Sequence, residues 1–395
     1  MTSSDKLVSW AEDRQYSLVT GGMFYCLMTK IGIVRGDRRR LALRALLFAA
    51  VAWLPLAIVT LINGTFSGEG VQLSFIEDFA VHIRLLLVIP FFIWVETIVD
   101  PAFDTDMNQT RRLVPPDAEK RFERIVRTTD SLSNSWIPEI VFLIGIYALY
   151  LFSGESLQIE GSHWSGGMPG SGDEIAAGYY LLVAVPIYQL LTAHWLWRWI
   201  VWGYSVLRAS FLPLRIDAAH ADKMAGLGYM TLVPAAFSMV CLGFSLVFTA
   251  WIAEQILYGG STLDGFYLPV GAFVVSIPLA THLPLLSFTP MMIREKVHAM
   301  SRYGSLLQYH NNLFRAKWLE GNLPDESSLG SLDNSSIADI NSSYQQAIRD
   351  MQLFPFTRAS IVYPILLLFL PFTPLVFTVY SLPELVSTLA QILGG

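Results

Sequence analysis

Seven long apolar runs alternate with polar connectors along the 395-residue chain. Each run is close to the ~20 residues that an α-helix needs to cross a ~30 Å hydrocarbon core. The pattern therefore predicts an all-α, polytopic helical membrane protein with about seven transmembrane helices. The predicted spans are 42–62, 79–99, 136–153, 176–200, 229–253, 267–292 and 361–381.

The basic residues are distributed unevenly among the connectors. Connectors 63–78, 154–175 and 254–267 contain no Lys or Arg, whereas the connectors that alternate with them hold nearly all of these residues. Loops rich in Lys and Arg are retained in the cytoplasm when a membrane protein inserts. The distribution predicts a cytoplasmic N-terminus and an external C-terminus, and we expect a bacterial inner membrane as the location.

Composition also indicates a lipid environment. Apolar residues make up 53% of the chain and charged residues only 15%, too few for a water-soluble domain of this length. The formal net charge of −6 carries no prediction, because the acidic and basic connectors lie on opposite sides. We expect the lipid bilayer as a partner, and no nucleic acid. Anionic lipid at the basic segment 35–44 and a homo-oligomer are further candidate partners.

The connectors divide the chain into four regions. Residues 1–41 form a basic cytoplasmic segment, and 42–293 form a six-helix transmembrane region with a cytoplasmic amphipathic helix near 116–132. Residues 294–360 form a cytoplasmic helical loop. Residues 361–395 hold the last transmembrane helix and a short outer tail, in which 382–393 is apolar enough for a surface or re-entrant helix.

Ionisable residues inside the spans are the main functional candidates, because a charge near the bilayer centre costs several kcal/mol and is kept with a partner or a water path. Spans two, four and six run in the same direction, and each carries a proline followed by a polar residue. If these helices adjoin, the three polar residues converge at one depth as an intramembrane ion or proton site. The pairs are Pro90 with Glu96, Pro186 with His194, and Pro278 with His282.

Other interpretations of these three residues stay open. The two imidazoles and the carboxylate are also a donor set for a metal ion, and His194 with His282 is a pair suited to axial haem ligation. A simpler interpretation places Glu96 and His194 at the membrane interface and gives His282 one hydrogen bond to a neighbouring helix. No resident cofactor is expected under that interpretation.

A cluster of tryptophans surrounds Arg198 near the inner end of span four. Amphipathic rings and a guanidinium that reaches toward headgroups are typical of an interfacial belt. The sequence therefore predicts that this cluster faces the membrane interface rather than a ligand. The tryptophans are Trp195, Trp197, Trp199 and Trp202.

The connector before span five is dense in chemical groups, with His220, Asp222, Lys223, Gly226 and Gly228 within nine residues. Together with Leu-Phe-Pro-Phe before the last span, this loop resembles an uncharacterised family of bacterial multi-pass membrane proteins. The family's loop is similar to His-Pro-Asp-Lys/Arg-Ala-Gly-Gly-Leu-Gly. The resemblance implies a membrane location and no activity. This chain departs from that pattern at Ala221, Met224 and Ala225.

No phosphate-binding glycine loop, metalloprotease helix motif or nucleophile elbow occurs in the sequence. The leading hypothesis is therefore transport or permeation of an ion or small solute through a path edged by Glu96, His194 and His282. One alternative is an enzyme that acts at the cytoplasmic face through His220 and Asp222. The other is a scaffold or sensor whose inner loops bind a partner.

Overall fold

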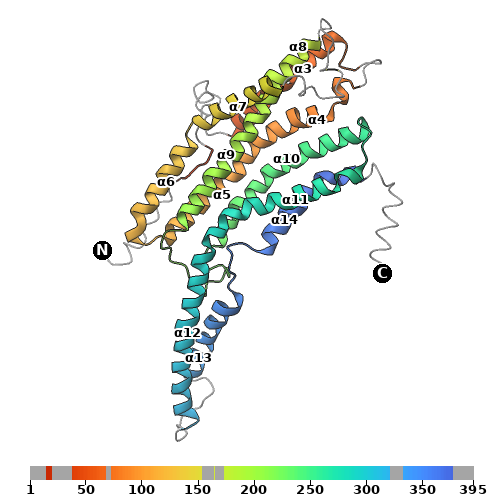
Figure 1. Ribbon diagram of the computed structural model, residues 1–395. Helices are drawn as coiled ribbons and strands as arrows, with labels where there is room; N and C mark the ends of the chain where they lie inside the picture. Colours follow the sequence, from red (N-terminus) through yellow and green to blue (C-terminus); the bar gives the residue numbers. More distant parts are fainter. Residues whose placement is uncertain are drawn as a thin grey trace, which may run out of the picture.

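The computed structural model describes residues 15–19, 38–67, 73–153, 164, 173–320 and 332–376. Within these residues all regular structure is helical, which confirms the all-α prediction (Figure 1). The predicted outer helix 382–393 and most of the basic segment 1–41 lie outside the described residues. The side chains of the candidate lipid-binding segment 35–44 are described only from Leu41 onward.

Six helical stretches of the described chain are long and apolar enough to cross a membrane. They coincide with six of the seven predicted spans, so the chain is a multi-pass membrane protein. The stretches are Leu41–Asn63, Phe79–Leu113, Glu174–Ala209, Gly228–Leu257, Leu263–Trp318 and Arg358–Leu375.

Several of these stretches change helix type along their length. The second consists of α4 (Phe79–His82), the π-helical η2 (Ile83–Val88) and α5 (Ile89–Leu113). The third consists of α8 (Asp173–Tyr179), the π-helical η5 (Tyr180–Ala184) and α9 (Val185–Ala209). The others are built from α3 (Arg38–Asn63), η6 (Gly228–Thr231), α10 (Leu232–Leu257), η7 (Leu263–Phe266), α11 (Tyr267–His282), η8 (Leu283–Phe288), α12 (Thr289–Trp318), α14 (Arg358–Phe369), η10 (Leu370–Phe372) and α15 (Thr373–Val376).

The remaining predicted span, 136–153, is the helix α7 (Ile137–Ser153), which has 17 residues. It lies antiparallel against α9. Tyr147 donates its hydroxyl to the Leu182 carbonyl near one end, and Glu139 lies beside His194 near the other. A helix of this length spans about 25 Å, slightly less than the ~30 Å of a hydrocarbon core.

Contacts between distant residues show that successive stretches alternate in direction. Trp53 of α3 donates its indole N–H to Nδ1 of His82 at 2.9 Å, while Arg44 at the start of α3 pairs with Glu96. α3 and α5 are therefore antiparallel. Arg84 of η2 contacts Tyr180 of η5 near the level of His82, and further along the chain Glu96 of α5 pairs with Arg198 of α9. Therefore α9 runs parallel to α5.

The later helices continue this alternation. The Tyr229 hydroxyl lies 2.9 Å from Oγ1 of Thr110, and Gly243 lies against Phe92, so α10 is antiparallel to α5. His282 at the end of α11 packs against Phe356, just before α14 begins. We call the level of Thr110, His282 and Phe356 the inner end, following the predicted topology.

Proline explains the two π-helical segments. Pro90 and Pro186 each follow a π-helical segment by two residues, in η2–α5 and η5–α9. Proline lacks an amide donor and its ring clashes with the carbonyl four residues earlier, so a wider turn before the proline relieves the clash. The side chains of Arg84 and Tyr180 meet where the two widened turns lie side by side.

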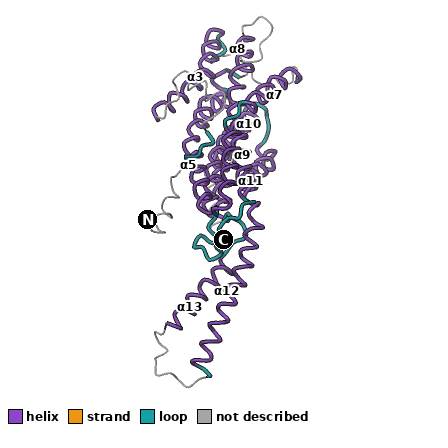
Figure 2. The backbone as a smooth tube through the Cα atoms, turned by 90° about the vertical axis from the view of Figure 1, so that its left-hand side faces the viewer, coloured by secondary structure: helices purple, strands orange, loops and turns teal. Residues whose placement is uncertain are grey.

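Two further elements lie at the inner end. The predicted amphipathic helix is confirmed as η3 (Pro116–Ala118) followed by α6 (Glu119–Ser133), which buries Phe122, Ile125 and Val126. α12 extends beyond the bundle, and α13 (Leu332–Gln345), with the π-helical η9 (Gln346–Asp350) after it, lies along α12. Both views show this helix pair projecting from the rest of the molecule (Figures 1 and 2).

The surface of the bundle is apolar where helices face outward. Leu46 is 67% exposed, Ile62 79% and Leu268 82%. Such large exposed apolar residues on several neighbouring helices are unstable in water and are expected where lipid is the solvent. This surface agrees with the bilayer as the partner of these helices.

Candidate functional site

Glu96 is buried on α5 with 7% of its surface exposed, and two arginines flank its carboxylate. Nη2 of Arg44 lies 2.6 Å from Oε2, and Nη2 of Arg198 lies 3.1 Å from Oε1. These pairs connect α3, α5 and α9 in the inner half of the bundle. A buried carboxylate with charged donors on both oxygens is held in one position, because losing either partner leaves a charge uncompensated.

Arg198 is 5% exposed and its guanidinium carbon lies 4.6 Å from the centroid of the Trp195 ring. Trp195 and Trp202 are also buried, at 2% and 0% exposure. The predicted interfacial belt is therefore wrong for these three residues. The reason is that Glu96, on a neighbouring helix, compensates the arginine inside the protein, so the guanidinium has no need to reach headgroups.

His194 lies one helical turn before Arg198 and pairs with a carboxylate from α7. Its Nδ1 is 3.4 Å from Oε1 of Glu139, which is 6% exposed. Residues four apart lie on one face of a helix, so His194 lies next to Arg198 and, through it, to Glu96. Glu96 and His194 therefore belong to one connected cluster of ionisable side chains from four helices, which we call the charge cluster: Arg44, Glu96, Glu139, His194 and Arg198.

His282 occupies a different environment. Its Nδ1 lies 2.8 Å from the Pro278 carbonyl, and its ring packs edge-on against Phe356 at a centroid distance of 5.5 Å. Among the described residues, none of its contacts reaches Glu96 or His194. Glu96 and His194 thus have different partners and, within the described ranges, are linked only through Arg198 on α9, while His282 lies on α11. The convergence of all three at one site stays a prediction.

Sequence reasoning missed three members of the charge cluster. Arg44, Glu139 and Arg198 all lie inside the predicted spans, as Glu96 does. Arg44 continues the basic run before span one and Arg198 lies among tryptophans, so both have the pattern of interfacial residues. Asp106 lies beyond residue 99, where span two is predicted to end, so the sequence places it in a loop. In the structure α5 continues fourteen residues further, and Asp106 is a buried helical residue. Its carboxylate accepts the indole N–H of Trp202.

The described part of the N-terminal segment is attached to the same helix. Asp100 accepts the amide of Leu18 at 2.9 Å and Asp104 accepts that of Tyr16 at 2.7 Å. Tyr16 and Leu18 are buried, at 3% and 1% exposure. Residues 15–19 therefore lie at the inner half of the bundle, against α5.

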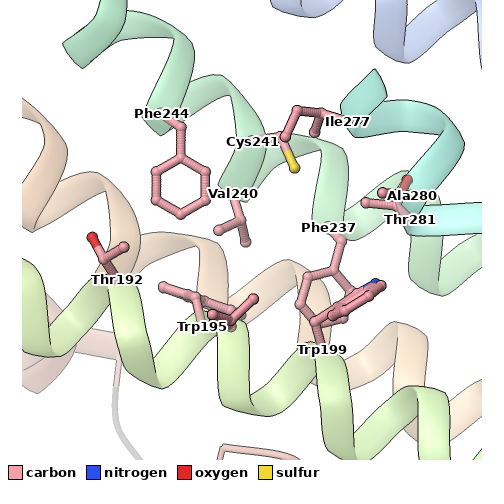
Figure 3. Close-up of a pocket in the computed structure, with 11 residues that line it drawn as sticks. Thr192, Trp195, Trp199, Phe237, Val240, Cys241, Phe244, Ile277, Ala280 and Thr281 are labelled. Atoms are coloured by element: carbon pink, nitrogen blue, oxygen red, sulfur yellow. The ribbon is translucent and has the colours of Figure 1, made fainter. Parts of the chain in front are cut away.

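An apolar cavity of about 380 Å³ lies next to the charge cluster, between α9, α10 and α11 (Figure 3). Trp195, whose ring stacks on Arg198, forms part of its wall, and Thr281 beside His282 forms another part. No ionisable acid or base other than the Cys241 thiol lines it, so it offers a charged solute no compensation. The full lining is Thr192, Trp195, Leu196, Trp199, Phe237, Val240, Cys241, Phe244, Ile277, Ala280 and Thr281.

The loop before α10 folds around Asp222. The amides of Met224, Gly226 and Gly228 donate to its carboxylate at 2.9, 3.0 and 2.9 Å, and Nδ1 of His220 lies 2.8 Å from Oδ1. Burial acts to raise the pKa of this carboxyl, but these donors outweigh it and hold the pKa of Asp222 below its usual value. Asp222 is the residue that fixes the loop conformation.

The backbone of this loop is unusual at three positions. Lys223, Ala225 and Gly226 have φ values of 61°, 58° and 88°, in the region that favours glycine. Lys223 is further fixed because its carbonyl accepts the Gln352 amide at 2.8 Å and its Nζ lies 3.6 Å from a carboxylate oxygen of Asp350. The predicted loop motif is thus a tightly bonded turn, attached to the segment before α14.

Across the described ranges, no group of three His, Cys, Asp or Glu side chains has the spacing of a metal site. His194 and His282 each make their Nδ1 contact to a protein oxygen, as metal-binding histidines also do with their second nitrogen. Haem or metal ligation by His194 and His282 stays a prediction.

Comparison with known proteins found no matching protein family, no matching curated protein and no matching solved structure. The resemblance of the loop before span five to a bacterial membrane family therefore stays a prediction.

Proposed function

We propose that the protein moves a proton or a small ion through the inner half of the bundle, along the charge cluster. The observation that carries the proposal is the direct contact of ionisable side chains from α3, α5, α7 and α9 inside the membrane region. Charges at this depth cost several kcal/mol and cluster where membrane proteins conduct protons or ions.

His194 and Glu139 are the pair that exchanges a proton. Imidazole changes protonation near neutral pH, and a carboxylate oxygen 3.4 Å away is close enough to exchange a proton after one small movement. Glu96 is different, because two guanidinium groups neutralise it on both oxygens. We assign Glu96 to shaping the path and His194 with Glu139 to carrying the proton.

Reconstitution into liposomes that contain a pH-sensitive dye tests this proposal. With a potassium gradient and valinomycin as the driving force, the wild-type protein is expected to acidify or alkalinise the lumen faster than protein-free liposomes. His194→Gln and Glu139→Gln are each expected to slow this flux at least tenfold. The matched control is His298→Gln, on the exposed surface of α12, which is expected to keep wild-type flux.

Two results would overturn the proposal. One is wild-type liposomes that leak no faster than protein-free ones under either polarity of the potential. The other is unchanged flux in both His194→Gln and Glu139→Gln, with each variant eluting as a single folded species. His282→Ala is expected to keep its flux, because His282 makes no contact with the charge cluster.

A further inference from the structure

A second candidate site lies at the inner end, outside the charge cluster and independent of the proposed ion path. It is a cleft of about 370 Å³ between the end of α5 and the loop that precedes α10. This volume is within the range of small-molecule sites. The lining residues are Gln109, Arg112, Leu113, Arg215, Asp217, His220, Asp222, Ala225, Gly226, Gly228 and Tyr229.

Three polar side chains of this cleft have unused hydrogen-bonding capacity. In the described part of the chain, the side chains of Gln109 and Arg215 make no hydrogen bond or ion pair, and Nε2 of His220 makes none either. Arg215 is nonetheless fixed at its backbone, because its amide donates to the Leu113 carbonyl at 2.8 Å. A guanidinium, an amide and an imidazole therefore converge on one space from two segments.

The acidic residues of the cleft both accept hydrogen bonds from the backbone of the loop. Asp222 accepts three backbone amides and lies beside His220, and Asp217 accepts the amide of Ala219 at 3.0 Å. Nδ1 of His220 lies 2.8 Å from Oδ1 of Asp222, a contact that is an ion pair when the imidazole carries both protons. In that form Nε2–H is the second donor of the ring and is left for a ligand. Arg112 adds a second guanidinium to the lining. Among the described residues, the side-chain groups that the loop leaves without a partner, those of Arg215, Gln109 and His220, are donors and favour a negatively charged ligand.

We propose that this cleft binds a phosphate group, with Arg215 as its principal anchor and His220 and Gln109 as further donors. The planar fork of arginine matches the oxygens of phosphate, and imidazole and amide N–H groups bond to the remaining oxygens. The volume exceeds that of a bare phosphate ion, so a phosphorylated small solute fits. Because the cleft lies where α5 leaves the membrane region, the phosphate belongs either to a soluble solute or to a lipid headgroup.

Thermal unfolding of the full-length protein in a zwitterionic detergent tests the proposal, with inorganic phosphate as the probe and chloride balancing ionic strength. The midpoint temperature is expected to rise with phosphate and to saturate in the millimolar range. Arg215→Gln is expected to shift the half-saturating concentration at least tenfold upward, and His220→Gln several-fold. Arg208→Gln is the control, since Arg208 is exposed on α9 and does not line the cleft.

The absence of a saturable response in the wild-type protein would overturn the proposal, as would an equal half-saturating concentration in wild type and Arg215→Gln. Arg215 and His220 are exposed, so neither variant is expected to disturb folding, and the midpoint without phosphate checks this. Nanodiscs separate the two sources of phosphate. If phosphatidic acid in a phosphatidylcholine nanodisc abolishes the response to inorganic phosphate, a lipid headgroup occupies the cleft; if the response persists, the ligand is soluble.

Discussion

Glu96 and Arg198 form a buried ion pair, 3.1 Å from Oε1 to Nη2, between two membrane helices that run parallel. Arg44 closes the other side of the carboxylate at 2.6 Å. A π-helical segment precedes each residue of the pair on the outer side: η2 comes before Glu96, and η5 before Arg198. The pair therefore fixes the register between α5 and α9.

Glu96→Leu is expected to destabilise the protein by about 3–5 kcal/mol, because it leaves two buried arginines without a partner. The measurement is the midpoint of unfolding in mixed detergent micelles. Asp264→Asn, on an exposed outer turn, is the matched control and is expected to be neutral.

Replacing the whole triad separates lost pairing from lost packing. Arg44→Met, Glu96→Leu and Arg198→Met together are expected to recover most of the stability, since no unpaired charge then remains. A Glu96→Leu variant as stable as wild type would show that the ion pairs contribute nothing to the fold.

Gly243→Ala is expected to destabilise the contact between α10 and α5. A methyl group at Gly243 overlaps Cε1 of Phe92, and overpacking of a buried contact costs about 1–3 kcal/mol. Gly271→Ala on α11 is the control, because a methyl group there meets nothing within 4 Å. Thermal unfolding of the two variants compares them directly.

Phe92→Leu in the Gly243→Ala background tests the steric cause. Removing the ring is expected to restore part of the lost stability. Equal unfolding midpoints for Gly243→Ala and Gly271→Ala would contradict the close approach of the two helices.

Much of the fold can be predicted from the sequence, because lipid imposes length and polarity on each span. Each of the seven predicted spans coincides with helix over its described residues, and the helix near 116–132 is present as α6. The charge cluster was harder to predict. Its partners come from α3, α7 and α9, and apolar periodicity carries no information about which helices adjoin. The long extension of α5 past residue 99 also escapes the pattern, because Asp100, Asp104 and Asp106 read as a loop.

Ala225→Gly is expected to stabilise the loop before α10 by about 1 kcal/mol. Ala225 is fully buried at a φ of 58°, where an alanine is strained and glycine is not. Gly226→Ala, at a φ of 88°, is expected to have the opposite effect. Thermal unfolding measures both, and a lower midpoint for Ala225→Gly would contradict the strain.

Acid is expected to weaken the same loop through Asp222. A carboxyl whose pKa is lower in the folded state stabilises the fold above its unfolded pKa of about 3.9, and this stabilisation is lost as pH falls through the folded value. Asp222→Asn is therefore expected to be less stable than wild type at pH 6, with the difference shrinking below pH ~4. Unfolding midpoints from pH 6 to pH 3 measure this, and a difference that stays constant over that range would contradict the assignment.

Side-specific labelling of single cysteines tests the central prediction, that α7 crosses the membrane as a seventh helix beside the six longer stretches and so brings Glu139 into the charge cluster. In a Cys26→Ser, Cys241→Ser background, Asn134→Cys and Arg215→Cys mark the inner end, and Glu174→Cys and Asp264→Cys mark the outer end. A membrane-impermeant maleimide applied to sealed vesicles of known orientation is expected to label the first two only from the cytoplasmic side and the last two only from the opposite side. Labelling of residues 134 and 174 from the same side would show that α7 does not cross and would contradict the account.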